Sequence, residues 1–158
     1  MEINLRESCF LCLAKQLVIQ GLQTHRELLK TYATKDGKNN QPHLYTQLWN
    51  TVHGSKDSRV NPKHANRNAD ISVAVYAENT AIFHCKTSSI KGSLTANHGT
   101  LDVWCDAKGP RVSKILVNGM THAWPAGDDS KGGGKYIDHK HINYPEWLTA
   151  WFFANNRR

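Results

Sequence analysis

The spacing of apolar residues divides the first third of the chain into a helix, a linker and a strand. Over residues 9–34, apolar side chains recur every three or four positions, which predicts a helix with one buried face. The polar segment 35–42 has turn residues at Asp36-Gly37 and predicts a linker. Over 43–52, apolar and polar residues alternate as in a strand, and residues 53–62 then have the composition of a loop.

The middle of the chain reads as a helix followed mostly by strands. Residues 63–78 predict a helix after Pro62, although the alternation of Ile71, Val73 and Val75 also fits a strand. Further strands are predicted over 80–85, 100–106 and 111–117. The Ser-, Thr-, Gly- and Asn-rich segment 86–99 predicts a loop, and Gly109-Pro110 predicts the turn between the last two strands.

The end of the chain predicts a well-delimited helix. Asn143 suits the cap position, Pro145 suits the first turn, and one face carries Trp147, Leu148, Trp151 and Phe152. This order of helices and strands predicts an α/β layered domain. We expect residues 1–158 to form a single domain, with a helix and linker over 1–41.

Composition and charge are ordinary for a globular protein and exclude several classes. The chain has 39% apolar and 21% charged residues, and its formal net charge is +7. Lys and Arg are spread along the chain, and no nucleic-acid-binding motif is present, so we expect no nucleic-acid partner. No run approaches the roughly 18 apolar residues of a membrane span, and the first residues do not resemble a signal peptide. The location is unknown from this pattern, with the cytoplasm as the default.

The four cysteines do not predict a metal or redox site. Cys9 and Cys12 form one C-x-x-C, but no second pair completes a zinc site and no β-α-β pattern surrounds it. A structural role in a helix is the simpler interpretation. The Asp-His-Lys-His run at 138–141 offers too few ligands for a metal ion. The glycine-rich segment 131–135 lacks the Lys-Ser or Lys-Thr ending of a phosphate-binding loop. We therefore expect no metal and no cofactor.

Two loop residues are candidates for catalysis. Asp57 and His122 both follow predicted strands, and ligands bind at the carboxyl ends of strands in open α/β sheets. An acid followed later in the chain by a histidine also matches the order of the last two triad members in α/β-hydrolases.

Three segments carry a family resemblance. "HGSKDSRVNPKHAN" resembles the H-G-x-x-D-x-x-V-N-P-x-x-A segment of the polyhydroxybutyrate depolymerase-like esterases, and "GMTHAWPAG" resembles their G-x-x-H-A-W-P-G-G. The ending, "YIDHKHINYPEWLTAWFF", is similar to the closing segment of that family. The resemblance covers about residues 42–153, is weak over 70–100, and implies a partial α/β-hydrolase fold over 42–158.

The resemblance implies a role for each matched residue. Asp57 would be the triad acid and His122 the triad base that activates a serine toward an ester or polyester substrate. Trp124 and Pro125 would support the histidine loop or contact substrate, since proline restricts the backbone.

The sequence departs from the family at the nucleophile. No two glycines lie four positions apart, so the G-x-S-x-G elbow is absent. We therefore expect the C-terminal, truncated part of an esterase, inactive on its own because removing a triad serine costs about 10⁶ in rate in a related case.

Three alternatives stay open. A separate Ser-bearing chain could complete a half-enzyme. The chain could instead bind a polyester or acyl ligand without catalysis, through Trp124 and Tyr136. If the chain is active alone, Ser55 or Ser58 is the first candidate nucleophile.

Overall fold

The computed structural model describes residues 46–77, 80–91, 99–127 and 133–157. All of them belong to the compact unit Gln41–Arg158. The predicted helix over 9–34, the linker over 35–42 and the Cys9/Cys12 pair lie outside the described residues.

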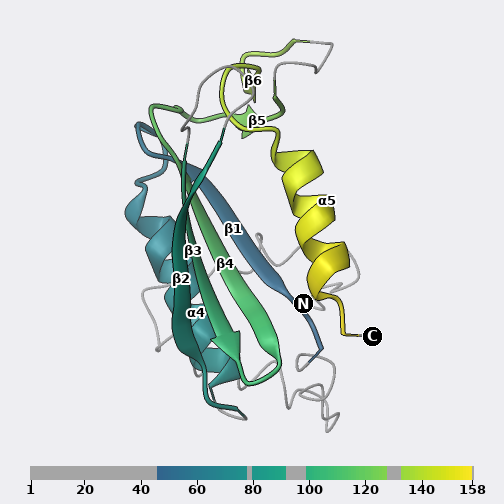
Figure 1. Cartoon of the computed structure of the whole chain (residues 1–158). Coiled ribbons are helices and arrows are strands. Elements are labelled where there is room, and N and C mark those ends of the chain that lie inside the picture. Colours follow the sequence, from purple (N-terminus) through teal and green to yellow (C-terminus); the bar gives the residue numbers. More distant parts are fainter. Residues whose placement is uncertain (1–45, 78–79, 92–98, 128–132, 158) are drawn as a thin grey trace, which may run out of the picture. The chain divides into compact units, whose positions relative to one another are not determined.

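A four-stranded mixed sheet forms the centre of this unit (Figure 1). Its strand order is β1-β4-β3-β2, with β1 at Trp49–Gly54, β2 at Phe83–Ile90, β3 at Gly99–Asp106 and β4 at Gly109–Val117. β1 runs parallel to β4, whereas β3 is antiparallel to both β4 and β2. A second, two-stranded parallel sheet pairs β5, Trp124–Pro125, with β6, Ile137–Asp138.

Two helices lie on opposite faces of the four-stranded sheet (Figure 1). α4, Lys63–Tyr76, buries Ala69 and Tyr76 against Val112 of β4. α5, Tyr144–Asn155, packs Trp147 and Leu148 against the other face. The buried residues of that second cluster are Ile90, Leu101, Val103, Cys105, Ile115, Val117, Met120, Ile142 and Tyr144. Helices on both faces of a mixed sheet make this an α/β fold, as predicted.

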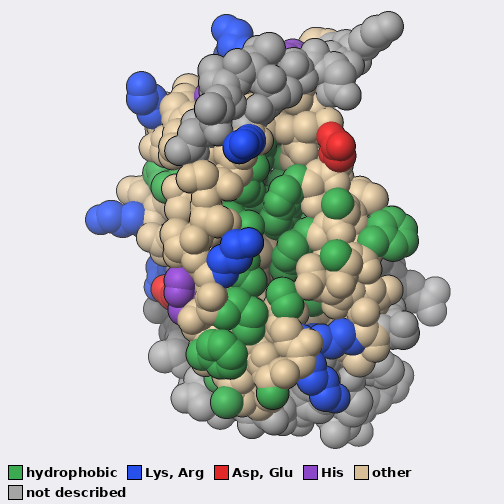
Figure 2. Space-filling model, in the orientation of Figure 1, with side chains coloured by type: hydrophobic (Ala, Val, Ile, Leu, Met, Phe, Trp, Pro, Cys, Tyr) green, Lys and Arg blue, Asp and Glu red, His purple; other side chains and the backbone are tan. Residues whose placement is uncertain are grey.

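The apolar face beside α5 is partly open. In the orientation of Figure 1, apolar side chains gather over the sheet alongside this helix (Figure 2). Phe152, which the sequence pattern assigns to the buried face, is 38% exposed, and Phe153 is 82% exposed. None of the described helices is long and apolar enough to cross a membrane.

Most predicted elements of the described part are confirmed, with shifted ends. Residues 63–76 are helical and not a strand, and the Asn143 side chain accepts a hydrogen bond from the Glu146 N–H as a cap. Within the described residues the first strand begins at Trp49, after residues 46–48, and it continues through Gly54, because it pairs with β4 from Val112 to Val117.

The predicted loop over 86–99 is wrong for residues 86–90. This segment continues β2, which pairs with β3 from Phe83 to Ile90. β2 lies at the edge of the sheet and most of its residues are exposed, so polar residues such as Thr87 and Ser89 are tolerated. A solvent-facing edge strand lacks the apolar alternation from which a buried strand is predicted.

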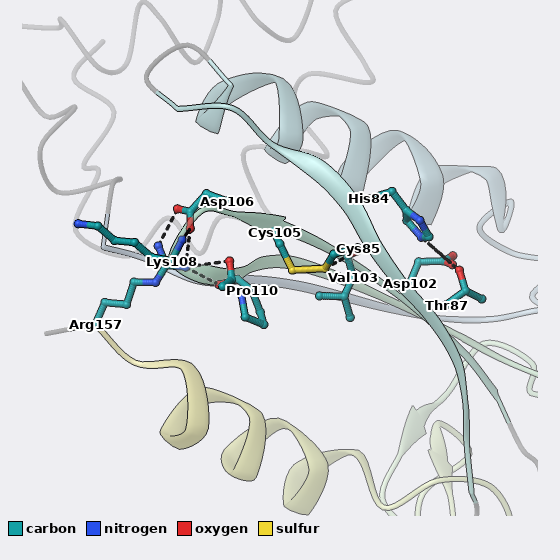
Figure 3. Close-up of a disulfide and its surroundings, with 11 residues drawn as sticks. His84, Cys85, Thr87, Asp102, Val103, Cys105, Asp106, Lys108, Pro110 and Arg157 are labelled. Atoms are coloured by element: carbon teal, nitrogen blue, oxygen red, sulfur yellow. Dashed lines mark hydrogen bonds and ion pairs between the residues drawn. A yellow bond between two sulfur atoms is a disulfide. The ribbon is translucent and has the colours of Figure 1, made fainter.

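Two long-range links close the β2–β3–β4 region (Figure 3). Cys85 of β2 and Cys105 of β3 form a disulfide, with their Cα atoms 5.8 Å apart. Arg157, just beyond α5, donates from Nη1 and Nη2 to Oδ2 and Oδ1 of Asp106 at 2.6 and 2.8 Å. Its Nη2 also donates to the Gly109 carbonyl at 2.8 Å, so the chain after α5 is attached to the β3–β4 turn.

Candidate active site

The site forms where the parallel neighbours β1 and β4 end. Gly54 is opposite Val117 in the register, so the two following loops start side by side. The Ser55 N–H donates to the Val117 carbonyl at 2.9 Å, and the Lys56 N–H donates to the Met120 carbonyl at 3.0 Å. The topology therefore brings together two loops that are more than sixty residues apart in sequence.

Gly54 allows the two loops to touch. A Cβ atom at this position would lie 2.3 Å from the Met120 carbonyl oxygen and 2.5 Å from that of Thr121. Gly119 turns the second loop with a φ of +79°, and its N–H donates to the Ser55 hydroxyl at 2.8 Å. Small residues at these two points set the distance between the loops.

Asp57 and His122 meet across this contact. Oδ2 of Asp57 is 2.8 Å from Nδ1 of His122. Oδ1 of Asp57 accepts hydrogen bonds from the backbone N–H groups of Arg59 and Val60, both at 2.9 Å. The aspartate side chain is 4% exposed and the histidine side chain 45% exposed. The acid is thus enclosed by its own turn, while the imidazole lies at the surface.

The surroundings of Asp57 keep it ionised. Burial by itself would raise the pKa of this carboxyl. The N–H groups of Val60 and Arg59, together with the His122 ring, outweigh burial and hold the pKa below its ordinary value. A carboxylate can only accept, so Nδ1 of a neutral His122 donates to it and Nε2 has the free lone pair. That is the tautomer in which an imidazole acts as a base through Nε2.

Trp124 and Pro125 lie in β5, directly after the histidine loop. The Trp124 N–H donates to the Tyr136 carbonyl at 2.7 Å, and the Ala126 N–H donates to the Asp138 carbonyl at 2.9 Å. Pro125 lies between these two donors and is buried. β6 therefore supports the segment that follows His122.

An aromatic surface flanks the histidine. Tyr136 presents its ring edge-on to the His122 ring, with centroids 5.8 Å apart. The Arg59 guanidinium and the Lys135 ammonium lie 5.7 and 5.8 Å from the centre of the Tyr136 ring. Trp124 and Tyr136 are 47% and 46% exposed, so both side chains present aromatic surface to solvent near the histidine loop.

The two serines nearest to Asp57 make no hydrogen bond to His122. The Ser55 hydroxyl accepts from Gly119, and Ser58 is exposed on the turn. Within the four described stretches, Nε2 of His122 has no hydrogen-bonding side chain. A nucleophile for this candidate base is therefore not in place in the part of the chain that the structure describes.

Asp138 and His141, considered from sequence as a weak metal site, form a second carboxylate–imidazole pair. Oδ1 of Asp138 is 2.7 Å from Nδ1 of His141 and also accepts from the N–H groups of Lys140 and His141. The described residues contain no group of three or more His, Cys, Asp or Glu side chains that could hold a metal ion. The absence of a metal site from the whole chain stays a prediction.

His53 lies next to Asp57, one of the two catalytic candidates, but the sequence patterns did not single it out as a site residue. Its Nε2 lies 3.3 Å from Oδ2 of Asp57 and 2.9 Å from the Val60 carbonyl oxygen. The sequence offers one signal, since His53 opens the segment that resembles the H-G-x-x-D motif.

Comparison with known proteins gives a partial match. No family model matches the chain. A poly(3-hydroxybutyrate) depolymerase of Ralstonia pickettii is 32% identical over 114 residues, which are 72% of this chain and 22% of that protein. The chain thus spans about a fifth of the length of this relative. The match supports a distant, depolymerase-like relationship between this chain and one part of a poly(3-hydroxybutyrate) depolymerase.

Proposed function

We propose that Asp57 and His122 are the acid and base of a serine carboxylic-ester hydrolase of the depolymerase-like type. The observation that carries the proposal is the 2.8 Å contact between Oδ2 of Asp57 and Nδ1 of His122, with the carboxylate buried and the imidazole exposed. The partial match to a depolymerase indicates an ester or polyester as substrate.

The pair has a defined part in such a reaction. Nε2 of His122 takes the proton of a serine hydroxyl as its oxygen attacks the ester carbonyl, and then passes that proton to the departing alkoxide. Water hydrolyses the acyl-serine by the same route, with Nε2 again accepting and returning the proton. Asp57 stays ionised throughout and stabilises the imidazolium, which its lowered pKa favours.

We assign the serine to a segment or chain outside these 158 residues. They contain no G-x-S-x-G motif, and the Ser55 hydroxyl is already bonded to Gly119. On this proposal the chain does not turn over esters by itself, and a Ser-bearing partner completes the site. The partial α/β-hydrolase fold belongs to the same proposal.

A non-catalytic polyester-binding role is the second candidate. The exposure of Trp124 and Tyr136 favours it, because exposed aromatic side chains bind apolar chains without any nucleophile. It needs neither the buried acid nor the contact between Asp57 and His122.

Hydrolysis of p-nitrophenyl butyrate tests the proposal. The purified chain is assayed alone and after mixing with the Ralstonia depolymerase from which the 114 matched residues have been deleted. We expect no turnover from either protein alone and measurable turnover from the mixture. His122→Ala should lower the rate of the mixture by about 10⁴-fold or more, and Asp57→Asn by about 10⁴-fold.

The other outcomes separate the alternatives. Turnover by the chain alone that His122→Ala removes would place the nucleophile inside the chain, and Ser55→Ala and Ser58→Ala would locate it. An active mixture that is insensitive to His122→Ala would refute the assignment of the base. An inactive mixture, with tryptophan fluorescence that 3-hydroxybutyrate oligomers quench in the wild type but not in Trp124→Phe, would favour the binding role.

A further inference from the structure

His53 occupies a position from which it contacts the acid rather than the base. It is the penultimate residue of β1, and its side chain is 14% exposed. Its Nε2 lies 2.9 Å from the Val60 carbonyl oxygen and 3.3 Å from Oδ2 of Asp57. A carbonyl oxygen can only accept, so the 2.9 Å contact requires the proton of His53 to be on Nε2.

That proton is donated to the end of the Asp57 turn, at the Val60 carbonyl. The turn already has two hydrogen bonds, from the N–H groups of Arg59 and Val60 to Oδ1 of Asp57. His53 adds a bond to the carbonyl of the same Val60, which fixes the peptide units on both sides of this residue. Nε2 of His53 also lies 3.3 Å from Oδ2, the carboxylate oxygen that the turn's own N–H groups do not use.

The carboxylate is thereby surrounded by donors of different kinds. Among the described residues, Oδ1 accepts from two backbone N–H groups, whereas Oδ2 is paired with the His122 ring at 2.8 Å and lies 3.3 Å from Nε2 of His53. Rotation of the carboxyl about its Cβ–Cγ bond would break both sets of contacts at once. A carboxylate held by these contacts keeps Oδ2 directed at Nδ1 of His122, so it does not have to be reoriented before the two groups pair.

We propose that His53 is a positioning residue, which orients Oδ2 of Asp57 toward His122 by donating its Nε2 proton to the Val60 carbonyl while its ring lies against Oδ2. His53 contributes to the chemistry only through Asp57 and His122, so this role rests on the function proposed above. It touches no substrate atom and acts entirely through the acid.

The tautomer of His122 tests this role, and it can be measured in a protein that has no catalytic activity. Long-range ¹H–¹⁵N spectra of the labelled whole chain at neutral pH distinguish Nδ1–H from Nε2–H rings, and loss of the signal in His122→Ala assigns it. We expect His122 to be mainly Nδ1–H in the wild type, because Asp57 accepts that proton. A residue that merely stabilises the fold would not change this ratio in a folded variant.

Gln and Asn form the matched pair of substitutions. The amide nitrogen of Gln lies near the position of Nε2 and can still donate to Val60, whereas that of Asn is closer to the position of Nδ1 and cannot reach. We expect His53→Gln to retain the Nδ1–H form of His122. We expect His53→Asn to lower the ratio of Nδ1–H to Nε2–H about five- to tenfold, the loss of roughly one hydrogen bond. His84→Gln, on the distant strand β2, controls for the removal of a histidine.

Either result decides the role of His53. An Nδ1–H ratio unchanged in a folded His53→Asn would overturn the proposal, as would an equal loss in the Gln and Asn variants. If His53→Asn does not fold, a wild-type ratio in His53→Gln and a reduced one in His53→Ser supply the same comparison. A failed ester assay alongside a tautomer that depends on His53 would refute the proposed function and leave the positioning role intact.

Discussion

Gly54 is the last residue of strand β1, directly before the Asp57 turn. Because it has no side chain, the turn and the His122 loop can approach each other closely. The carbonyl oxygens of Met120 and Thr121 occupy the space that a Cβ atom would need. Backbone oxygens cannot rotate away as the end of a flexible side chain can. The loop that carries His122 would therefore have to move as a whole.

Gly54→Ala tests this close contact. We expect a loss of about 1–3 kcal/mol in the free energy of unfolding, from overpacking against backbone, and a weaker Asp57–His122 hydrogen bond. Urea denaturation gives the first quantity, and the His122 ring ¹⁵N shifts give the second. Gly133→Ala is the matched control, because a Cβ there would meet nothing within 4 Å. Equal stability of the two variants would contradict the steric argument.

At the scale of elements, the edge strand β2 depends on a covalent link. It pairs only with β3 among the described strands, and most of its side chains are exposed, so apolar burial contributes little to holding it. The Cys85–Cys105 disulfide joins it to β3 and closes a loop between residues 20 apart in sequence. Such a bond stabilises mainly by restricting the unfolded chain.

Reduction of this disulfide should destabilise the protein. We expect dithiothreitol to lower the free energy of unfolding by about 3 kcal/mol, the value typical of a loop of this length. Urea denaturation with and without reductant measures the difference. A variant with Cys9→Ser and Cys12→Ser, which keeps Cys85 and Cys105, should respond as the wild type does. A variant with Cys85→Ser and Cys105→Ser should not respond, and an equal response in both would exclude the disulfide as the cause.

At the scale of the whole molecule, buried and half-buried carboxylates link stability to pH. In the described part of the chain, four aspartates have a pKa below the ordinary value, because hydrogen bonds and nearby cations outweigh the burial that would raise it: Asp57, Asp102, Asp106 and Asp138. Their partners come from separate parts of the chain, for instance Lys114 for Asp102 and Arg157 for Asp106. A group with a lowered folded-state pKa stabilises the fold above its unfolded pKa and loses that contribution as the pH falls through the folded value.

Stability should therefore be nearly constant from pH 7 to about pH 5 and fall steeply below about pH 4, near the unfolded pKa of aspartate. Urea denaturation at pH 7, 5 and 3 measures this dependence. Asp106→Asn should be less stable at pH 7 and should lose less on acidification, because one of the linked groups is gone. Asp70→Asn, at an exposed position on α4, is the matched control for removing one negative charge. A free energy that stays level down to pH 3 would contradict the linkage.

The sequence by itself determined the elements whose signals are local. α5, β3 and β4 follow from apolar periodicity, a capping Asn143 and turn glycines, all of which act within a few residues. The sequence of α4 fitted both a helix and a strand, and the structure shows the helix. Asp57 and His122 were also found from sequence, as candidates on loops after strands. Their catalytic roles stay a prediction, whereas their contact is a property of the structure.

Only the tertiary structure decided what depends on residues far apart in the chain. The parallel pairing of β1 with β4 sets the ends of β1 and brings Asp57 within 2.8 Å of His122. Pairing with β3 makes residues 86–90 a strand despite their polar composition, and strand register brings Cys85 close to Cys105. His53 lies beside Asp57 because the fold of β1 and the turn after it brings the two side chains together. The other contacts depend on register between distant segments, and register is set by the packing of the whole sheet rather than by any short stretch of sequence.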